Sequence, residues 1–394
     1  VTTITNITID ADDNTAASND YQALTIVSGY AGTADELTVT VNSDATNGMN
    51  GTEGLITASG VETLTLSLTG DAAVQFGGFT STTLETVTVA AGSSFLVTST
   101  ADLGTITGGT NNSILTYDSS AADIAVTATV ASLGDNAAVT LGDGADVFAT
   151  TGSTGTNITI DAGAGADNIT GAAGAEIING GAGDDVIDGV GGGDTINGDA
   201  GNDTLTGDDN EADTLNGGAG NDILDGDGGL DSLTGGTGSD VFVFGVNVDT
   251  EAADLVTVAD FTAGFGGDVI RLHAVTGGTT GIAGGVAADL TLSVAALAGA
   301  ANNSIIIDTL NNAGAGHANE AAYEAAVEAV GTGTTDWVGM YWDSTDSQLK
   351  LVANDDSTVG GAAPVLIGVF SNVTTAAEAT TFMAAMVTQN FDVI

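Results

Sequence analysis

A nine-residue period over the middle of the chain constrains the fold more than any other feature. From Ala162 to Thr206 the blocks are AGAGADNIT, GAAGAEIIN, GGAGDDVID, GVGGGDTIN and GDAGNDTLT, and a ten-residue block, GDDNEADTLN, follows at 207–216. The blocks GGAGNDILD, GDGGLDSLT and GGTGSDVFV end at Val243, and an outlying copy, LGDGADVFA, occupies 141–149. Such a period predicts a solenoid in which each block supplies one turn and one strand.

Two positions of the block keep one chemical type throughout. Position eight is always a large apolar residue, which predicts a side chain pointing into the solenoid. Residues one to six read as a glycine-rich turn, and residues seven to nine as a three-residue strand. Position six always carries a carboxylate: Asp146, Asp167, Glu176, Asp185, Asp194, Asp203, Asp213, Asp222, Asp231 and Asp240.

Two blocks make one coil of eighteen residues, so carboxylates two blocks apart are expected on the same side of the solenoid. The expected pairs are Asp167 with Asp185, Asp185 with Asp203, Asp203 with Asp222, Asp222 with Asp240, Glu176 with Asp194, Asp194 with Asp213, and Asp213 with Asp231. Calcium takes six to eight oxygen ligands, carboxylates and carbonyls included. Each pair therefore predicts a bound calcium ion, about seven or more in all.

Glycine leaves the turn carbonyls uncovered, so these oxygens are expected to complete each calcium shell. The candidate carbonyl ligands are those of Gly181, Gly183, Gly218, Gly220, Gly236 and Gly238. Glu176 departs from the aspartate pattern and predicts a weaker site. The extra residue in 207–216 predicts a bulged turn near Asn210 and Glu211.

The G-G-x-G-x-D-x-U-x pattern resembles the calcium-binding repeat of RTX proteins. The resemblance implies a parallel β-roll that is unfolded without calcium, and an extracellular location reached by type I secretion through an uncleaved C-terminal signal. RTX chains include proteases, lipases, toxins, adhesins and S-layer proteins. The first 140 residues, with strands such as VETLTL, resemble the solenoid portions of proteobacterial S-layers.

Residues 1–140 alternate apolar and Thr residues with a period of two, as in ELTVTV (36–41) and VETLTLSL (61–68), which predicts half-buried strands. Strand spacing favours a parallel solenoid, and a β-sandwich remains the alternative. Thr-x-Thr recurs at 38–40, 63–65, 86–88, 105–107 and 127–129. A flat row of such residues can bind ice or carbohydrate, or form an ordinary outward strand face; the uneven intervals predict poor alignment.

After the repeats, DLVTVADF (254–261) and GGDVIRL (266–272) resemble the segment that closes many RTX β-rolls. Asp254 and Asp260 are candidate ligands of the last ion, or they solvate the end of the roll. Further on, helices are expected at 319–330 and 376–387, and antiparallel strands at 337–343, 348–355 and 364–370. Trp337, Tyr341 and Trp342 are expected in the core or at a sheet edge.

The predicted fold class is all-β: a parallel β-solenoid leads into a calcium-binding parallel β-roll, followed by a small α+β C-terminal region. The predicted domains are 1–140 for the solenoid, 141–272 for the roll with its closing segment, and 273–394 for the C-terminal region, which includes the expected secretion signal.

The net charge of the chain limits the classes of partner that it can bind. The chain has 52 acidic residues against two basic ones, Arg271 and Lys350, and a formal net charge of −50. Nucleic acid is excluded as a partner because phosphate binding needs clustered cations, and attachment to anionic lipid is disfavoured. No apolar run approaches the roughly 20 residues that span a bilayer. Bound divalent cations are expected to offset the repulsion among the acidic side chains.

The inventory of reactive residues argues against an enzyme. There is no Cys and only one Lys, the two histidines (His273 and His317) stand apart, and neither H-E-x-x-H nor G-x-S-x-G occurs. The predicted function is an extracellular calcium-dependent structural protein that assembles with itself into a surface layer. The alternative is an adhesin or biofilm-matrix protein that binds a surface, a glycan or lipopolysaccharide without forming a lattice.

Overall fold

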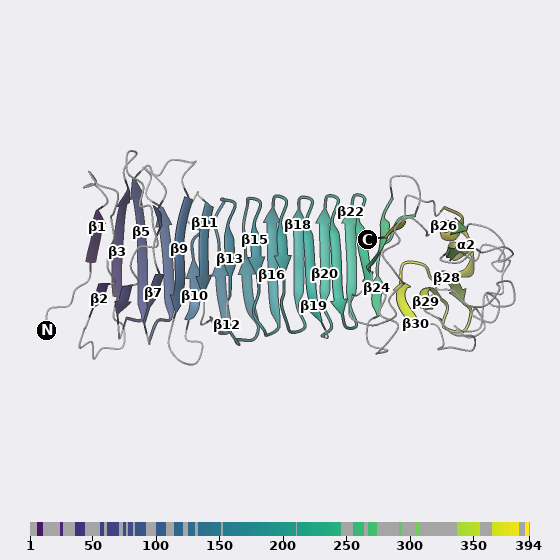
Figure 1. Cartoon of the computed structure of the whole chain (residues 1–394), viewed down its shortest axis with the longest axis horizontal. Helices are drawn as coiled ribbons and strands as arrows, with labels where there is room; N and C mark the ends of the chain where they lie inside the picture. The colour runs from purple at the N-terminus through teal and green to yellow at the C-terminus, as the bar shows by residue number, and fades with distance from the viewer. Residues whose placement is uncertain are drawn as a thin grey trace. The chain divides into compact units, whose positions relative to one another are not determined.

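The computed structural model describes the chain in two compact units, Val1–Thr204 and Leu205–Ile394. The strands of both units are labelled in Figure 1. The domain boundaries predicted from the sequence stay predictions. The described residues are 6–10, 24–26, 36–43, 56–58, 61–70, 74–75, 78–81, 83–91, 100–107, 114–120, 125–130, 133–150, 153–209, 211–245, 255–263, 267–273, 291–293, 304–307, 337–354, 365–385 and 391–393.

The first unit is a parallel β-solenoid with two sheets, so the sandwich alternative is wrong. Successive coils add one parallel strand to each sheet. Sheet A contains β1 (Asn6–Asp10), β3 (Glu36–Ser43), β5 (Thr63–Gly70), β8 (Thr86–Ala91), β10 (Ile114–Asp118), β12 (Leu133–Thr140), β14 (Ile158–Asp161), β16 (Glu176–Ala182) and β18 (Thr195–Ala200). Sheet B contains β2 (Leu24–Ile26), β4 (Ile56–Ala58), β7 (Gly78–Thr80), β9 (Thr100–Thr107), β11 (Ala125–Val130), β13 (Val147–Ala149), β15 (Asn168–Thr170) and β17 (Val186–Asp188), and β6 (Val74–Gln75) pairs with β9.

The core of this solenoid is a stack of apolar side chains from alternate strand positions. The position-eight residues lie in register between coils, as in Phe148 beside Ile169 and Ile169 beside Ile187. They are at most 1 % exposed in both units, as predicted: Phe148, Ile169, Ile178, Ile187, Ile196, Leu205, Leu215, Leu224, Leu233 and Phe242. Burial of these inward-pointing side chains thus drives folding, because each buried aliphatic side chain contributes about 1.5–3 kcal/mol of stability.

The Thr-x-Thr motifs align better than their spacing suggested. In sheet A, Thr38 pairs with Thr65, and Thr65 pairs with Thr88. A second row joins Thr63 to Thr86. The motifs at 105–107 and 127–129 belong to sheet B instead. Loop length absorbs the uneven intervals, so the prediction of poor alignment was wrong for 38–40, 63–65 and 86–88.

Within the first unit, strand length in the repeats differs between the two sheets. The sheet B strands β13, β15 and β17 have three residues each, as predicted. The prediction was wrong for the second unit's strands at 214–219, 223–228 and 232–237, which have six residues each, and for β16 and β18, which have seven and six. The pairing of β16 with β18 continues through turn residues, with Gly181 opposite Asp199 and Ala182 opposite Ala200, because small turn residues let adjacent backbones approach closely.

The second unit continues the same architecture. In its repeats, β20 (Thr214–Ala219), β22 (Ser232–Thr237) and β24 (Val256–Val258) pair in parallel, as do β21 (Ile223–Gly228), β23 (Val241–Gly245) and β25 (Val269–His273). Strand β19 (Thr204–Asp209) begins at the last residue of the first unit. The C-terminal strand β30 (Val365–Phe370) then pairs with β24, and β31 (Phe391–Val393) pairs with β25. Segments late in the sequence therefore close the last coil on both sheets.

The C-terminal region contains the predicted antiparallel strands. Strand β29 (Gln348–Asn354) pairs antiparallel with β28 (Trp337–Asp343) and with β30, while β26 (Thr291–Ser293) and β27 (Ser304–Ile307) extend the sheet in parallel. Tyr341 and Trp342 are buried, at 0 % and 5 % exposure, which confirms them as core aromatics. The side chain of Trp337 lies outside the described residues.

Of the two predicted helices, one falls on described residues. Helix α2 spans Ala376–Ala385, and Thr375 and Glu378 form a reciprocal capping box at its start. The helix packs onto the closing segment, since the Phe382 ring lies 5.5 Å from that of Phe261. The helix predicted at 319–330 lies outside the described residues.

Replacing a position-eight residue should destabilise the roll much more than replacing its outward neighbour. Ile196 is fully buried, so Ile196→Ala should cost about 2–5 kcal/mol of unfolding free energy through lost burial and a cavity. Ile177, 46 % exposed on the outer face, is the matched control, and Ile177→Ala should cost under about 1 kcal/mol. Urea unfolding in saturating calcium measures both. Equal losses would contradict the assigned inward face.

Candidate metal centre

The position-six carboxylates are buried although nothing positive accompanies them in the repeats. Each is 0–2 % exposed, and they occupy the junction between turn and strand: Asp146, Asp167, Glu176, Asp185, Asp194, Asp203, Asp213, Asp222, Asp231 and Asp240. The two basic residues of the chain, Arg271 and Lys350, both follow the repeats. Buried carboxylates normally need a paired charge or a metal ion.

The structure stacks these residues as predicted within each unit. The backbone N–H of Asp167 donates to Oδ1 of Asp185 (2.7 Å), and that of Asp185 donates to Oδ1 of Asp203 (2.8 Å). The other in-unit contacts of this kind join Glu176 to Asp194 (2.7 Å), Asp213 to Asp231 (3.0 Å) and Asp222 to Asp240 (3.0 Å). The pairs Asp203–Asp222 and Asp194–Asp213 join residues of different units and stay predictions.

The second carboxylate oxygen faces the inside of its own turn. Oδ2 of Asp185 lies against Gly180, where a Cβ would sit only 2.5 Å away. In the second unit Asp222 lies in the same way against Gly217, at 2.4 Å from such a Cβ. The first glycine of the block is therefore required because the carboxylate occupies the space of a side chain.

These inner oxygens fit a cation. Oδ2 of Asp167, Oδ2 of Asp185 and Oε1 of Glu176 are buried without a hydrogen-bond partner. A buried acceptor that carries charge and lacks a donor costs free energy, and a bound calcium ion would remove this cost. Within the described residues, no three His, Cys, Asp or Glu side chains group to hold a metal. The predicted calcium shell, two carboxylates completed by backbone carbonyls, stays a prediction.

The turn glycines have the conformation that such a shell needs. Gly181 and Gly183 have φ of 104° and 134°, and a Cβ on them would lie 2.0 and 1.6 Å from the carbonyl oxygens of Gly163 and Gly165. Side chains are thus excluded where carbonyls of one coil point at the next. Gly218, Gly220, Gly236 and Gly238 of the second unit share positive φ, between 97° and 150°. Their role as ligands stays a prediction.

The turn that contains Glu176 differs from the turn of the following block. Neither Ala172 nor Gly174 has the positive φ found at the corresponding Gly181 and Gly183. Oε2 of Glu176 accepts a hydrogen bond from the N–H of Ala172 at 3.1 Å, as Oδ2 of Asp146 does from the N–H of Gly142 at 3.2 Å. The weaker site expected at Glu176 stays a prediction.

Burial raises the pKa of these carboxyl groups, against hydrogen bonds from backbone N–H groups that lower it. The pKa of Asp167 and of Glu176 rises to about 7, and that of Asp146 and of Asp203 to about 6. Burial likewise raises the pKa of Asp185 and Asp240. Without metal these acids therefore take up protons at about pH 6 to 7, well above the usual range of a carboxyl group.

Asp146 begins the ladder of stacked carboxylates. Its Oδ1 accepts the N–H of Val126 at 2.7 Å, and its own N–H donates to Oδ1 of Asp167 at 2.6 Å. Hydroxyl groups close other turns of this unit, before and after Asp146. Oγ of Ser153 accepts the N–H of Leu133 at 3.0 Å, and Oγ of Ser81 donates to the carbonyl of Val61 at 2.8 Å. A neutral hydroxyl at these two positions needs no counter-charge.

Sequence reasoning missed Asp268, which continues the ladder after the last repeat. It is 3 % exposed, and its Oδ1 accepts the N–H of Asp240 at 2.9 Å. Burial raises its pKa to about 6. The signal was present in AGFGGDVIR (263–271), which keeps the position-six acid and the position-eight apolar residue although its first glycine is lost.

Asp254 and Asp260 are the two candidate calcium ligands predicted in the closing segment. Asp260 accepts the N–H groups of Gly235 and Gly236 at 2.9 and 2.8 Å, so it caps backbone donors of the last repeat. Asp254 lies outside the described residues, as does Asn210 in the predicted bulge.

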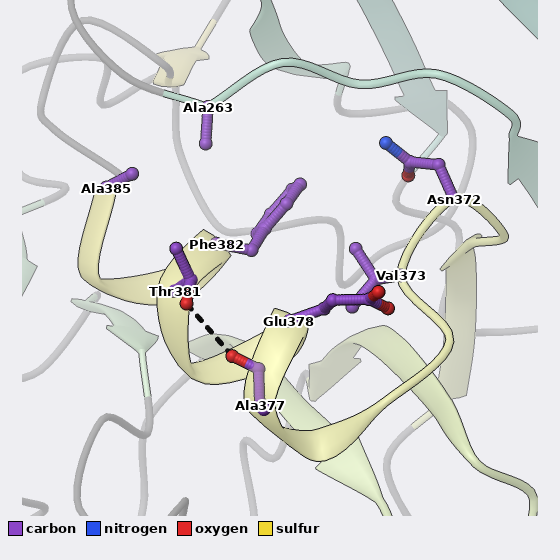
Figure 2. A pocket seen from close by; sticks show the side chains of 8 residues that line it. All are labelled: Ala263, Asn372, Val373, Ala377, Glu378, Thr381, Phe382 and Ala385. Atoms are coloured by element: carbon purple, nitrogen blue, oxygen red, sulfur yellow. Dashed lines mark hydrogen bonds between the residues drawn. The ribbon is translucent and has the colours of Figure 1, made fainter.

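A hollow of about 490 Å³ lies beside α2 (Figure 2). It is lined mainly by apolar side chains, including Val373 and Phe382. Its one charged residue, Glu378, already accepts the N–H groups of Thr374 and Thr375 in the helix cap. The hollow therefore presents no group that is poised for chemistry.

Comparison with known families agrees with this geometry. A family model described as RTX calcium-binding nonapeptide repeat (4 copies) matches residues 151–187, 188–211 and 208–242. No curated protein and no solved structure gives a match. The middle of the chain is therefore a run of RTX repeats, which bind calcium. The number of ions stays a prediction. In the described part of the chain no helix is long and apolar enough to cross a membrane.

Removing calcium should unfold the repeats before the N-terminal coils. Chelation leaves the stacked carboxylates of 162–243 without a counter-charge, whereas the neutral hydroxyl of Ser81, which closes a turn within the first 140 residues, needs none. Circular dichroism should lose part of its β signal, and limited proteolysis should cut first within 162–243. An unchanged signal, or first cuts within 1–140, would contradict this. Magnesium in place of calcium is the control.

Low pH should partly compensate for the absence of calcium in stabilising the folded repeats. Folded pKa values of about 6 to 7 exceed the usual value near 4, so the folded state holds more protons than the unfolded state between these values. Metal-free stability should therefore fall as pH rises from about 4 to about 7. Thermal unfolding in chelator should give a higher midpoint at pH 5 than at pH 7.5. Asp167→Asn should reduce this difference, and a higher midpoint at pH 7.5 would refute it.

Proposed function

We propose that this chain is an extracellular calcium-dependent structural protein that assembles with itself into a surface layer or a related array. The observation that carries the proposal is the ladder of buried carboxylates in RTX repeats, within a chain of net charge −50. Copies with this charge repel one another, and a divalent cation both completes the fold and offers a bridge between exposed acids.

The chain has little cationic surface with which to bind a copy of itself directly. Lys350 is 4 % exposed and bonds to Asp343 at 2.9 Å and Asp346 at 2.7 Å within its own sheet. Its charge is therefore used inside the second unit. Calcium between exposed carboxylates is the remaining source of strong attraction between acidic edges.

The reactive inventory supports a structural role over an enzymatic one. The whole chain offers no Cys, one Lys and two His, and the Lys is buried in an ion pair. RTX-repeat β-rolls are generally structural and RTX proteins are typically secreted. Type I secretion and a final location on the cell surface form part of the proposal.

The adhesin alternative rests on one specific observation. The aligned Thr rows of sheet A present hydroxyl groups at the regular spacing of parallel strands, about 4.8 Å. Such a face suits contact with a repetitive surface, for example a glycan or lipopolysaccharide layer. An adhesin would use it while remaining monomeric.

Assembly should require calcium and not only ionic strength. Protein in calcium should form ordered sheets or filaments in electron microscopy, whereas protein in sodium at equal ionic strength should not, because monovalent ions screen but cannot bridge. Circular dichroism at each calcium concentration separates folding of the roll from assembly. Equal assembly in both salts would remove calcium bridging, and folded monomers in calcium would favour the adhesin.

A further inference from the structure

Charge is unevenly distributed over the first unit. Among the described residues of 125–204, the exposed carboxylates Asp143 and Asp184 lie between strands. Three more lie on sheet A strands, Asp135 on β12, Asp161 on β14 and Asp199 on β18, whereas the strands of sheet B carry one, Asp188 on β17. The outer surface of the solenoid is therefore least acidic over part of its strands.

The outer surface of sheet B over β11, β13, β15 and β17 is the clearest case. Parallel register places two residues of each strand in two outward rows. Asp188, at one end, is the only charged member of the two rows. The first row is Thr127, Val147, Asn168 and Val186, and the second is Thr129, Ala149, Thr170 and Asp188. We call these eight residues the sheet B face.

This face exposes apolar side chains among the described residues of the unit. Val147 and Val186 are 43 % and 48 % exposed, and they flank Asn168 in the same row. The outward surface of sheet A over β12 to β18 is more polar. There Asp161 accepts the amide of Asn179 at 2.6 Å, and Asn179 accepts that of Asn197 at 2.9 Å.

We infer that copies of this chain contact one another through the sheet B face. The inference rests on the proposed self-assembly and names its contact surface. For identical partners of net charge −50, approach costs least where both surfaces lack carboxylates. Two flat sheets also pack face to face at about 10 Å, which brings the valines of two copies into contact. The acidic turns then lie at the rim, where calcium ions join them.

Charge reversal at the two valines tests this contact. Val147→Asp with Val186→Asp adds two negative charges, and Val147→Lys with Val186→Lys adds two positive charges. Burying an unpaired charge of either sign opposes contact, so both variants should need roughly tenfold more protein to assemble in calcium. If net charge alone governed assembly, the lysine variant would assemble more readily than the wild type.

The matched control places the same charges on the outside of sheet A. Thr159 and Ile177 are neighbours in register there, and Ile177 is 46 % exposed. Thr159→Asp with Ile177→Asp, and the lysine pair, should assemble like the wild type. Circular dichroism and calcium titration of every variant must first show an unchanged fold.

The outcomes separate the inference from the proposed function. Loss of assembly in both valine variants and not in the controls supports the sheet B face. Normal assembly of the valine variants, or equal loss in the sheet A controls, overturns this face and leaves calcium-dependent assembly intact. A wild type that stays monomeric in calcium overturns both. Valine variants that assemble normally but lose adhesion to a glycan-coated surface would show that the face serves a different partner.

Discussion

The stability of the RTX β-roll depends on carboxylates that are buried without a basic partner. In each coil Oδ1 of one aspartate accepts the backbone N–H of the corresponding residue in the neighbouring coil, as between Asp167 and Asp185. The second oxygen is held inside the turn over a glycine. The same carboxylate thus fixes the register between coils and leaves a buried negative charge that a cation can balance. The regular stacking of the coils is therefore coupled to calcium binding.

The same solenoid contains turns that bury no such charge. Ser153 takes the structural role of the aspartate by accepting the N–H of Leu133, and the coil needs no counter-charge because a hydroxyl is neutral. Asp146 connects the two kinds of turn, since it bonds to Val126 before it and to Asp167 after it. The first unit therefore combines turns closed by a neutral hydroxyl with turns that need a counter-charge.

Much of the β-roll could be predicted from the sequence. The nine-residue period determines which residues point inward and on which side of the solenoid each carboxylate lies. Position eight gave the core residues, and the eighteen-residue coil gave the carboxylate neighbours within each unit. Other features depend on distant backbone. Asp268 follows Asp240 by 28 residues, so a strict period could not reach it, and the extension of β16 through Gly181 follows from pairing with β18. The alignment of Thr38 with Thr65 was hidden because loops of unequal length are compatible with equal strand register.

Segregation of charge follows from the same geometry. The repeat directs one acid per block inward, and strand positions alternate between the core and an outer surface. In the first unit the further exposed acids lie between strands and on sheet A, whereas the described sheet B strands of the repeats carry Asp188 alone. In the proposed assembly these surfaces have different uses, because acidic surfaces repel until a divalent ion joins them, whereas the sheet B face offers exposed side chains such as Val186. Calcium would then act twice, first to order the coils that create the flat face and then to neutralise the acids that keep two copies apart.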